Sequence, residues 1–133
     1  MLEDFIQANF LGAKILPYVA TGSRVKCRLY SCEKGDILVV FMASDSISKE
    51  KLCSALGVPA VKPLSPKLAE EASGYSFEFM PPISIYGVRL VMDKKVLSSE
   101  KVKCIVSEAE TLVIPPKEIL ESNEESETAE ITR

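Results

Sequence analysis

A run of apolar residues at positions 36–43, Asp-Ile-Leu-Val-Val-Phe-Met-Ala, constrains the fold of this chain more than any other feature. Successive side chains of a β-strand point to opposite faces, so a strand that is apolar at nearly every position must be covered on both sides. The run is far shorter than the ~20 residues that a membrane-spanning helix needs. It therefore predicts a central strand of a sheet with other elements packed against both faces.

Capping residues around this strand indicate two helices. One helix is predicted over residues 46–56 and ends at Gly57, and a second opens with Ser65 and Pro66 and ends at Gly74. The other predicted elements are a short helix at 4–11, strands at 13–20, 24–32, 60–64, 84–92, 101–106 and 110–114, and a helical turn from Pro116. Together they predict an α+β domain, with a mixed, curved β-sheet and packed helices.

The length of 133 residues fits one domain, and charge is distributed unevenly along it. Residues 121–133 hold five glutamates, one arginine and few apolar side chains, which predicts an acidic, flexible tail. Residues 1–120 would then form the single domain. Without the tail this domain is close to neutral, which argues against a surface that coats nucleic acid and permits only a local basic patch.

Cysteine and histidine usage narrows the chemistry. The chain has no histidine, which excludes a Ser-His-Asp triad, a Cys-His pair and an imidazole general base. The cysteines form no CxxC pair, so we expect reduced, mostly buried thiols, no metal site and no cofactor. Glu3 and Asp4 do not fit a secretory leader, so we expect a cytoplasmic location and no membrane partner. The four cysteines are Cys27, Cys32, Cys53 and Cys104.

A long segment carries an ordered series of motifs. A helix ends in Ala-Leu-Gly at Gly57, Ser65-Pro66 opens the next helix, and Ser73-Gly74-Tyr75 follows it. A Pro81-Pro82 loop and a strand ending at Asp93 come next. Each motif is weak by itself, but their order and spacing together are specific. Over roughly residues 24–120 the chain resembles the YbaK / prolyl-tRNA-synthetase-associated editing domain family, and this resemblance implies the same fold.

The resemblance implies a freestanding aminoacyl-tRNA deacylase, which hydrolyses the ester of a mischarged tRNA. Such domains typically act on a small amino acid such as Ala or Cys, including on the tRNA for proline. Editing is needed because one methylene in a synthetase pocket is worth only ~1–3 kcal/mol. The implied partners are the aminoacylated acceptor end of tRNA and an aminoacyl-tRNA synthetase. The chemistry needs no histidine, because backbone N–H groups can stabilise an oxyanion while an oriented water attacks.

The resemblance places the family's site lysine at Lys26, which becomes the candidate catalytic residue. The period of two puts Arg24, Lys26 and Arg28 on one face of their strand, where cations can meet a phosphate or the terminal adenosine. A solvated outer face of the strand is the alternative for these three residues. The other candidate substrate-binding residues are Gly74, Glu78, Phe79, Met80, Pro81, Pro82 and Glu108.

Departures from the family pattern leave other functions open. Glu78-Phe79 stands where the family has Gly-Gly, the late glycine-rich loop is replaced by residues 107–110, and the region ahead of Lys26 is short. The alternative function is a catalytically inactive module of the same fold that binds tRNA or a protein partner. A third interpretation is a protein that binds a small ligand in a pocket formed by residues 77–82. The same apolar residues would equally fit a loop that packs back on the core.

Overall fold

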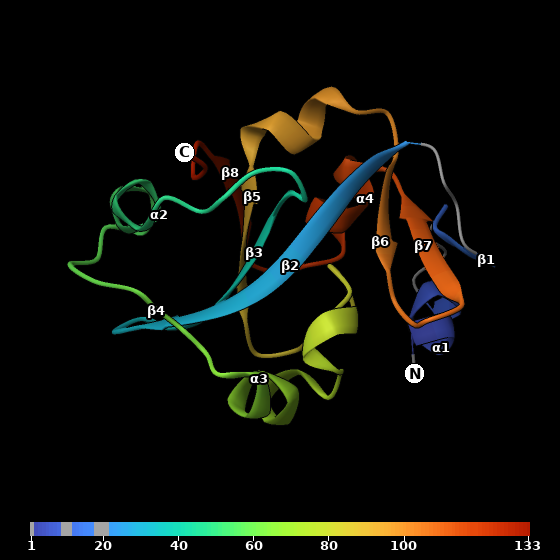
Figure 1. The fold of residues 1–133 in the computed structure, drawn as a ribbon, viewed down its shortest axis with the longest axis horizontal. Helices are drawn as coiled ribbons and strands as arrows, with labels where there is room; N and C mark the ends of the chain where they lie inside the picture. The colour runs from blue at the N-terminus through green and yellow to red at the C-terminus, as the bar shows by residue number, and fades with distance from the viewer. Residues whose placement is uncertain (1, 9–11, 18–21) are drawn as a thin grey trace.

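The computed structural model describes residues 2–8, 12–17 and 22–133, which form one mixed sheet with helices packed around it (Figure 1). The strand order is β1-β7-β6-β2-β3-β5-β8, and β4 pairs with β2 beside this path. The strands are β1 (Lys14–Pro17), β2 (Ser23–Cys32), β3 (Gly35–Met42), β4 (Lys62–Pro63), β5 (Arg89–Asp93), β6 (Val102–Ile105), β7 (Glu110–Ile114) and β8 (Ser126–Ala129). The helices are α1 (Leu2–Ala8), α2 (Lys49–Leu56), α3 (Pro66–Ser73) and α4 (Pro116–Glu121), with two short 3₁₀ helices, η1 (Phe77–Phe79) and η2 (Lys94–Ser98). The α+β fold expected from the sequence is confirmed.

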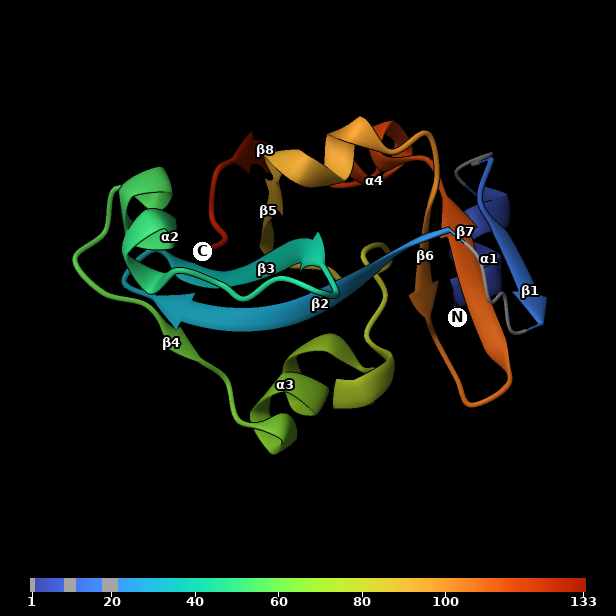
Figure 2. The same cartoon turned by 45° about the horizontal axis from the view of Figure 1, so that its top comes forward.

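The apolar run forms β3, at the centre of the sheet, as the sequence predicts. Strand β3 pairs antiparallel with β2 and parallel with β5. Leu38 and Val40 enter one core cluster, while Val39 enters a second cluster on the opposite face. Helix α2 covers the second face with Leu52, and α3 covers the first with Ala69 (Figure 2). A strand that is apolar on both sides is therefore buried on both sides.

Ser65, Gly57 and Gly74 cap helices where the sequence predicts, whereas α2 begins at Lys49, three residues later than predicted, with Ser48 as its N-cap. The Ser48 hydroxyl accepts from the Lys51 N–H to begin α2, and Ser65 does the same for α3 through the Leu68 N–H. Gly57 ends α2 with a φ of 68°, a left-handed conformation in which a side chain is strained. The boundaries of α2 and α3 therefore follow from local chemistry rather than from packing.

One predicted strand begins later than the sequence suggests. The pattern over 84–92 predicts a continuous strand, whereas β5 begins at Arg89. Ser84 and Gly87 adopt positive φ values of 68° and 76°, which a strand does not allow. Residues 84–88 instead form a loop that leads from the interior into β5.

The acidic C-terminal segment differs from the flexible tail that its composition predicts. Residues 126–129 form β8, which pairs in parallel with β5, and Ile131 is fully buried beside α2. The Ile131 N–H donates to the buried carboxylate of Asp93 at 3.0 Å, and its carbonyl accepts from the Ser48 N–H at 2.8 Å. The buried Ile131 side chain, the packed Ala129 side chain and a set of backbone hydrogen bonds therefore order a segment that is polar almost throughout.

In the described part of the chain, one edge of strand β2 is paired only near its two ends. It pairs with β6 through Ser23 and Arg24, and with β4 through Tyr30 and Ser31. Between these two pairings, the described strands leave the middle of β2 without a partner on this edge. Figures 1 and 2 show β6 turning away from β2 there, with the segment from α3 to η1 on the same side.

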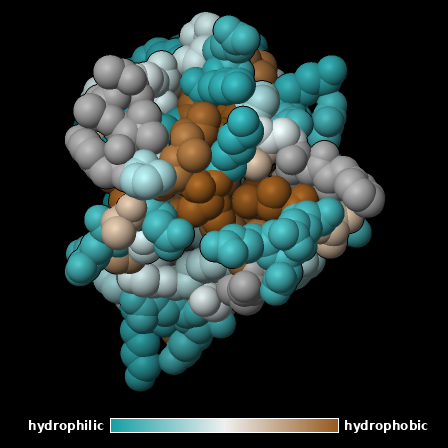
Figure 3. Space-filling view, turned by 90° about the vertical axis from the view of Figure 1, so that its right-hand side faces the viewer, coloured by the Kyte–Doolittle hydropathy of each residue, from teal (hydrophilic) through white to brown (hydrophobic). Residues whose placement is uncertain are grey.

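The far end of the sheet carries β6, β7 and β1, with α1 packed next to them. Leu2, Phe5, Ile6 and Ile15 are partly buried against the main core cluster. Viewed from this side, apolar side chains gather in a recessed area bordered by polar ones (Figure 3). Among the described residues, no helix is long and apolar enough to cross a membrane.

Candidate functional site

Three segments that carry candidate residues meet at the unpaired part of β2. The Cys104 thiol of β6 donates a hydrogen bond to the Met80 carbonyl at 3.4 Å. The same thiol is hydrogen-bonded to the thiol of Cys27, the residue that follows Lys26 on β2. Strand β2, the Pro-Pro loop and β6 are thereby joined beneath Lys26, and β6 leads directly to the loop that carries Glu108. This junction is the candidate site.

The Cys27 thiol at this junction is structural. Burial raises the pKa of Cys27 well above its usual value, and the hydrogen bond with Cys104 raises it further. A thiol must lose its proton to act as a nucleophile. Cys27 is therefore a neutral, buried group that positions the strand, and the nucleophile of any hydrolysis has to come from elsewhere.

The cations of β2 alternate with buried residues, as the period of two predicts. Arg24 is exposed, whereas Lys26 and Arg28 are partly buried, and Val25 and Cys27 between them point into the core. The three cations therefore share one face of the strand. Lys26 lies opposite Phe41 of β3, so its stem starts beside an apolar side chain while its charge is partly exposed.

Arg28 connects β2 to the loop segment. Its guanidinium carbon lies 4.6 Å from the ring centroid of Phe77 in η1, and it donates to the Cys27 carbonyl at 2.9 Å. A guanidinium stacked over an aromatic ring contributes about 0.5–1 kcal/mol at an exposed site. Arg28 thus occupies part of the open strand edge and holds η1 against it.

The loop of residues 78–82 turns from the surface into the core. Glu78 is exposed and Phe79 partly exposed, while Met80, Pro81 and Pro82 are buried. Among the described residues other than glycine, Ser84 alone has a positive φ, so Glu78 and Phe79 do not need the freedom of glycine. The second half of the loop folds back on the core, and its first half stays available at the surface.

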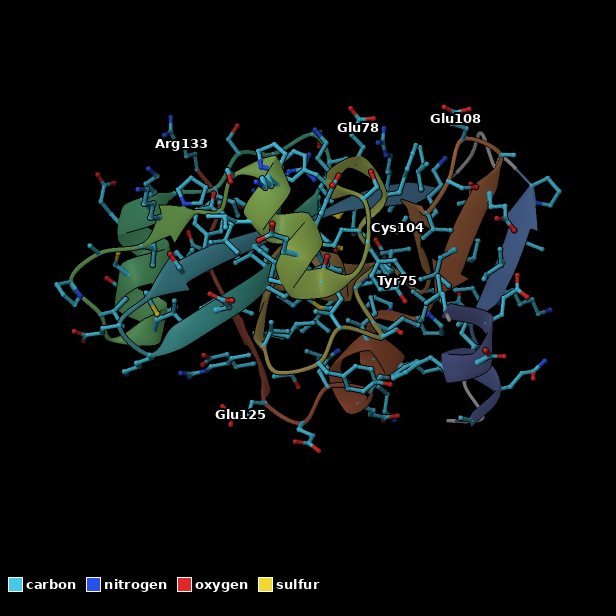
Figure 4. All side chains as sticks on the ribbon, turned by 90° about the horizontal axis from the view of Figure 1, so that it is seen from below. Tyr75, Glu78, Cys104, Glu108, Glu125 and Arg133 are labelled. Atoms are coloured by element: carbon cyan, nitrogen blue, oxygen red, sulfur yellow. The ribbon has the colours of Figure 1, made fainter. Side chains whose placement is uncertain are left out.

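Glu78 and Glu108 lie on the same edge of the molecule and point outward (Figure 4). Glu108 is exposed in the turn between β6 and β7, where the Ser107 hydroxyl accepts from the Ala109 N–H. Gly74 is the left-handed residue that ends α3, with a φ of 78°. The roles of these residues in substrate binding stay predictions, as does the catalytic role of Lys26.

The Cys27–Cys104–Met80 contact was not anticipated from the sequence. The sequence does predict that Cys27 faces the interior, because it follows Lys26 on the strand and successive side chains point to opposite faces. The identity of its partner on β6, by contrast, depends on tertiary packing. Within the described ranges, no group of three or more His, Cys, Asp or Glu side chains could hold a metal ion.

The fold and the junction together define an α+β domain of the YbaK-like type. The chain belongs to the aminoacyl-tRNA editing domain family, whose model matches residues 11–121. No curated protein matches the sequence closely enough to be significant.

Solved structures share the fold at low sequence identity. A candidate trans-editing enzyme for prolyl tRNA synthetase has a TM-score of 0.86 at 17% identity, over 99% of this chain and 94% of the other. The hypothetical protein APE2540 has a TM-score of 0.86 at 22% identity, with 99% of both chains covered. A designed epitope scaffold aligns with a TM-score of 0.87 at 16% identity, over 99% of this chain and 94% of the scaffold. These matches cover β8 and the residues around it, so the C-terminal segment is part of the shared fold.

Proposed function

We propose that this editing domain hydrolyses the ester that joins a small, misplaced amino acid to the 3′ end of a tRNA. The observation that carries the proposal is the junction at Cys104. It joins the Lys26 strand, the Pro-Pro loop and β6, the strand that leads into the Glu108 loop, in a member of the editing family. These are the three segments in which the family resemblance places the functional residues.

Recognition of the tRNA end is assigned to the cationic face of β2. Arg24 and Lys26 can pair with the terminal phosphates, and the outer surface of η1 lies beside them through the Arg28–Phe77 contact. We assign the partly exposed Phe79 to the entrance for the side chain of the amino acid. A side chain in place of glycine narrows this space, which favours a small amino acid. The Ala or Cys ester of a tRNA for proline is the first candidate.

The proposed hydrolysis forms one bond, breaks one bond and transfers one proton. A water oxygen bonds to the ester carbonyl carbon, the bond from that carbon to the ribose oxygen breaks, and a water proton passes to the ribose oxygen. The products are the free amino acid and an uncharged tRNA. In this proposal Lys26 stabilises the charge that develops on the carbonyl or phosphate oxygens, and the chain has no histidine to serve as base. Proton transfer therefore falls to water, to a carboxylate such as Glu78 or Glu108, or to groups of the substrate.

The partners that follow are the acceptor end of a charged tRNA and, through it, an aminoacyl-tRNA synthetase. The similar structure described as a candidate trans-editing enzyme for prolyl tRNA synthetase supports this choice. A charged tRNA also fits the cytoplasmic location that the sequence favours.

The test is a panel of mischarged tRNAs, including the Ala and Cys esters of the tRNA for proline. Wild type should release the amino acid from at least one member. Lys26→Ala should lose most of this activity while its melting temperature stays unchanged. Lys117→Ala is the matched control, because Lys117 is a highly exposed lysine on α4 whose contact with Glu121 is 3.8 Å.

Two outcomes would contradict the proposal in different ways. Full activity of Lys26→Ala would remove Lys26 from the site. The absence of turnover by wild type on every ester would favour the inactive binding module, which the Glu78-Phe79 replacement already suggests. That module would still bind uncharged tRNA, and a filter-binding measurement with the same three proteins would detect it.

A further inference from the structure

A cleft on another side of the molecule lies away from Lys26, and it approaches the candidate site only at the buried end of the Pro-Pro loop, where Asn123 donates to the Pro82 carbonyl at 3.3 Å. It has a volume of about 800 Å³ and is formed by α1, the β2–β3 turn, the loop of residues 84–89 and the segment 121–125. Lys26 does not line it. The β2–β3 turn follows Cys32, six residues along β2 from Lys26, which corresponds to about 20 Å. Figure 4 shows Glu125 on the opposite edge of the molecule from Glu78 and Glu108.

An aromatic side chain stands open in this cleft. Tyr86 is 75% exposed, and its ring meets Phe5 of α1 edge to face at a centroid distance of 6.1 Å. The loop that carries Tyr86 is anchored from below, because the hydroxyl of the partly buried Tyr75 donates to Ser84 at 2.8 Å. Ser84 holds its unusual positive φ at this anchor. The exposed Tyr86 ring is thus carried by a loop that a partly buried hydrogen bond fixes to the core.

The charge around the ring is predominantly negative. Asp36, Glu121, Glu124 and Glu125 line the cleft. Two cations also line the cleft: Arg89 pairs with Glu127 at 2.7 Å, and Lys34 donates to the neutral Leu56 carbonyl at 2.8 Å and keeps its charge, so four carboxylates face two cations. The carboxylates come from both the β2–β3 turn and the segment after α4, so they border the cleft on more than one side.

We infer that this cleft binds a basic segment of a partner protein, with a Lys or Arg side chain over the Tyr86 ring and neighbouring cations on the surrounding carboxylates. Aromatic faces attract cations, and the attraction grows as the cation loses water. Several separated carboxylates suit a chain that carries several cations. The same charge repels the phosphates of RNA, so this surface is not a continuation of the tRNA-binding face.

The experiment uses the full chain and a fluorescein-labelled nonapeptide in which Arg, Lys and Gly alternate. Binding is followed by fluorescence anisotropy, and an otherwise identical peptide with Glu at every cationic position is the negative probe. The basic peptide should bind and the acidic one should not. Tyr86→Ala and the double variant Glu124→Gln/Glu125→Gln should each weaken binding by about fivefold or more. Rising salt should weaken it further.

The matched control is the double variant Glu71→Gln/Glu100→Gln, which removes the same charge from exposed positions outside the cleft. It should bind the peptide nearly as wild type does. Equal weakening in the control would show that binding follows net charge, and would overturn the inference. Undetectable binding of the basic peptide to wild type at millimolar concentration would also overturn it.

Two further measurements distinguish a peptide site in this cleft from a polyamine site and from peptide binding at β2. Spermidine that displaces the peptide at an equal concentration of positive charge would assign the cleft to a small polyamine, against the inference. Backbone amide shifts on peptide addition should centre on residues 84–88 and 121–125. Shifts centred on β2 instead would contradict it. Ester hydrolysis by the cleft variants should stay unchanged, so this test and the test of the proposed function can fail separately.

Discussion

The replacement Ile131→Ala tests whether the C-terminal segment is an integral part of the fold. Ile131 is fully buried in the cluster that α2 forms with β3 and β5. Its backbone links the Asp93 carboxylate to Ser48, the N-cap residue of α2. The substitution keeps these backbone bonds and removes only the side chain beyond Cβ. Its effect therefore measures the burial of one side chain in a polar segment.

The expected magnitude follows from burial. Removing three methylene-sized groups at about 0.8 kcal/mol each costs roughly 2.4 kcal/mol of transfer free energy. A rigid cavity adds to this, and measured Ile→Ala changes in cores run from about 2 to 5 kcal/mol. We expect the free energy of unfolding to fall by about 3 kcal/mol. With a urea m-value of about 2 kcal/mol/M, the unfolding midpoint would fall by about 1.5 M.

Urea unfolding followed by circular dichroism is the assay, with Ile131→Val as a graded control expected to cost about 0.5–1.5 kcal/mol. Thr128→Ala, which alters a partly exposed side chain of β8, should change the free energy of unfolding far less. A loss below about 0.5 kcal/mol for Ile131→Ala would mean that the segment detaches at little cost. That result would refute its assignment as the last strand of the sheet and restore the flexible tail.

Two further perturbations concern buried ionisable groups. Asp93→Ala should lower the free energy of unfolding, measured in urea, by about 2–4 kcal/mol, because it removes the acceptors of the Lys95 and Ile131 N–H groups. Asp93→Asn keeps one acceptor oxygen and should lower it less. Equal losses for the two variants would contradict this account. Burial raises the pKa of Cys27, Tyr30 and Tyr75, so their neutral forms are favoured in the folded state. Stability from these groups is complete below about pH 8 and should fall as the pH rises through their folded pKa values. Melting temperatures from pH 7 to 11 should show this fall, and Cys27→Ala should reduce its first part; a flat profile would contradict it.

Local chemistry made much of the fold predictable from the sequence. The apolar run predicts β3, and Ser65, Gly57 and Gly74 mark three of the helix ends found in the structure. These features depend on residues within one turn or one strand, where sequence and conformation are directly coupled. The alternation on β2 is of the same kind.

Features that depend on distant partners were not predictable in this way. Composition alone describes residues 121–133 as acidic and polar, and only the pairing with β5 shows why they are ordered. The positive φ of Ser84 interrupts an apolar pattern that otherwise reads as a strand. The contact of Cys27 with Cys104 likewise joins strands whose relation is set by the completed sheet. Periodicity carries no information about such partners.

The order of strands in the sheet also has a kinetic consequence. Three of its pairings are parallel, and each joins segments far apart in the chain, as when Ser23 of β2 meets Val102 of β6. Closing such long loops costs chain entropy before any contact repays it, which slows folding into the range of milliseconds to seconds. The β2–β3 hairpin can form early, since its strands are joined by a short turn. The apolar faces of this hairpin stay exposed to solvent until β5 and α2 pack against them. During this interval the chain is most prone to aggregation.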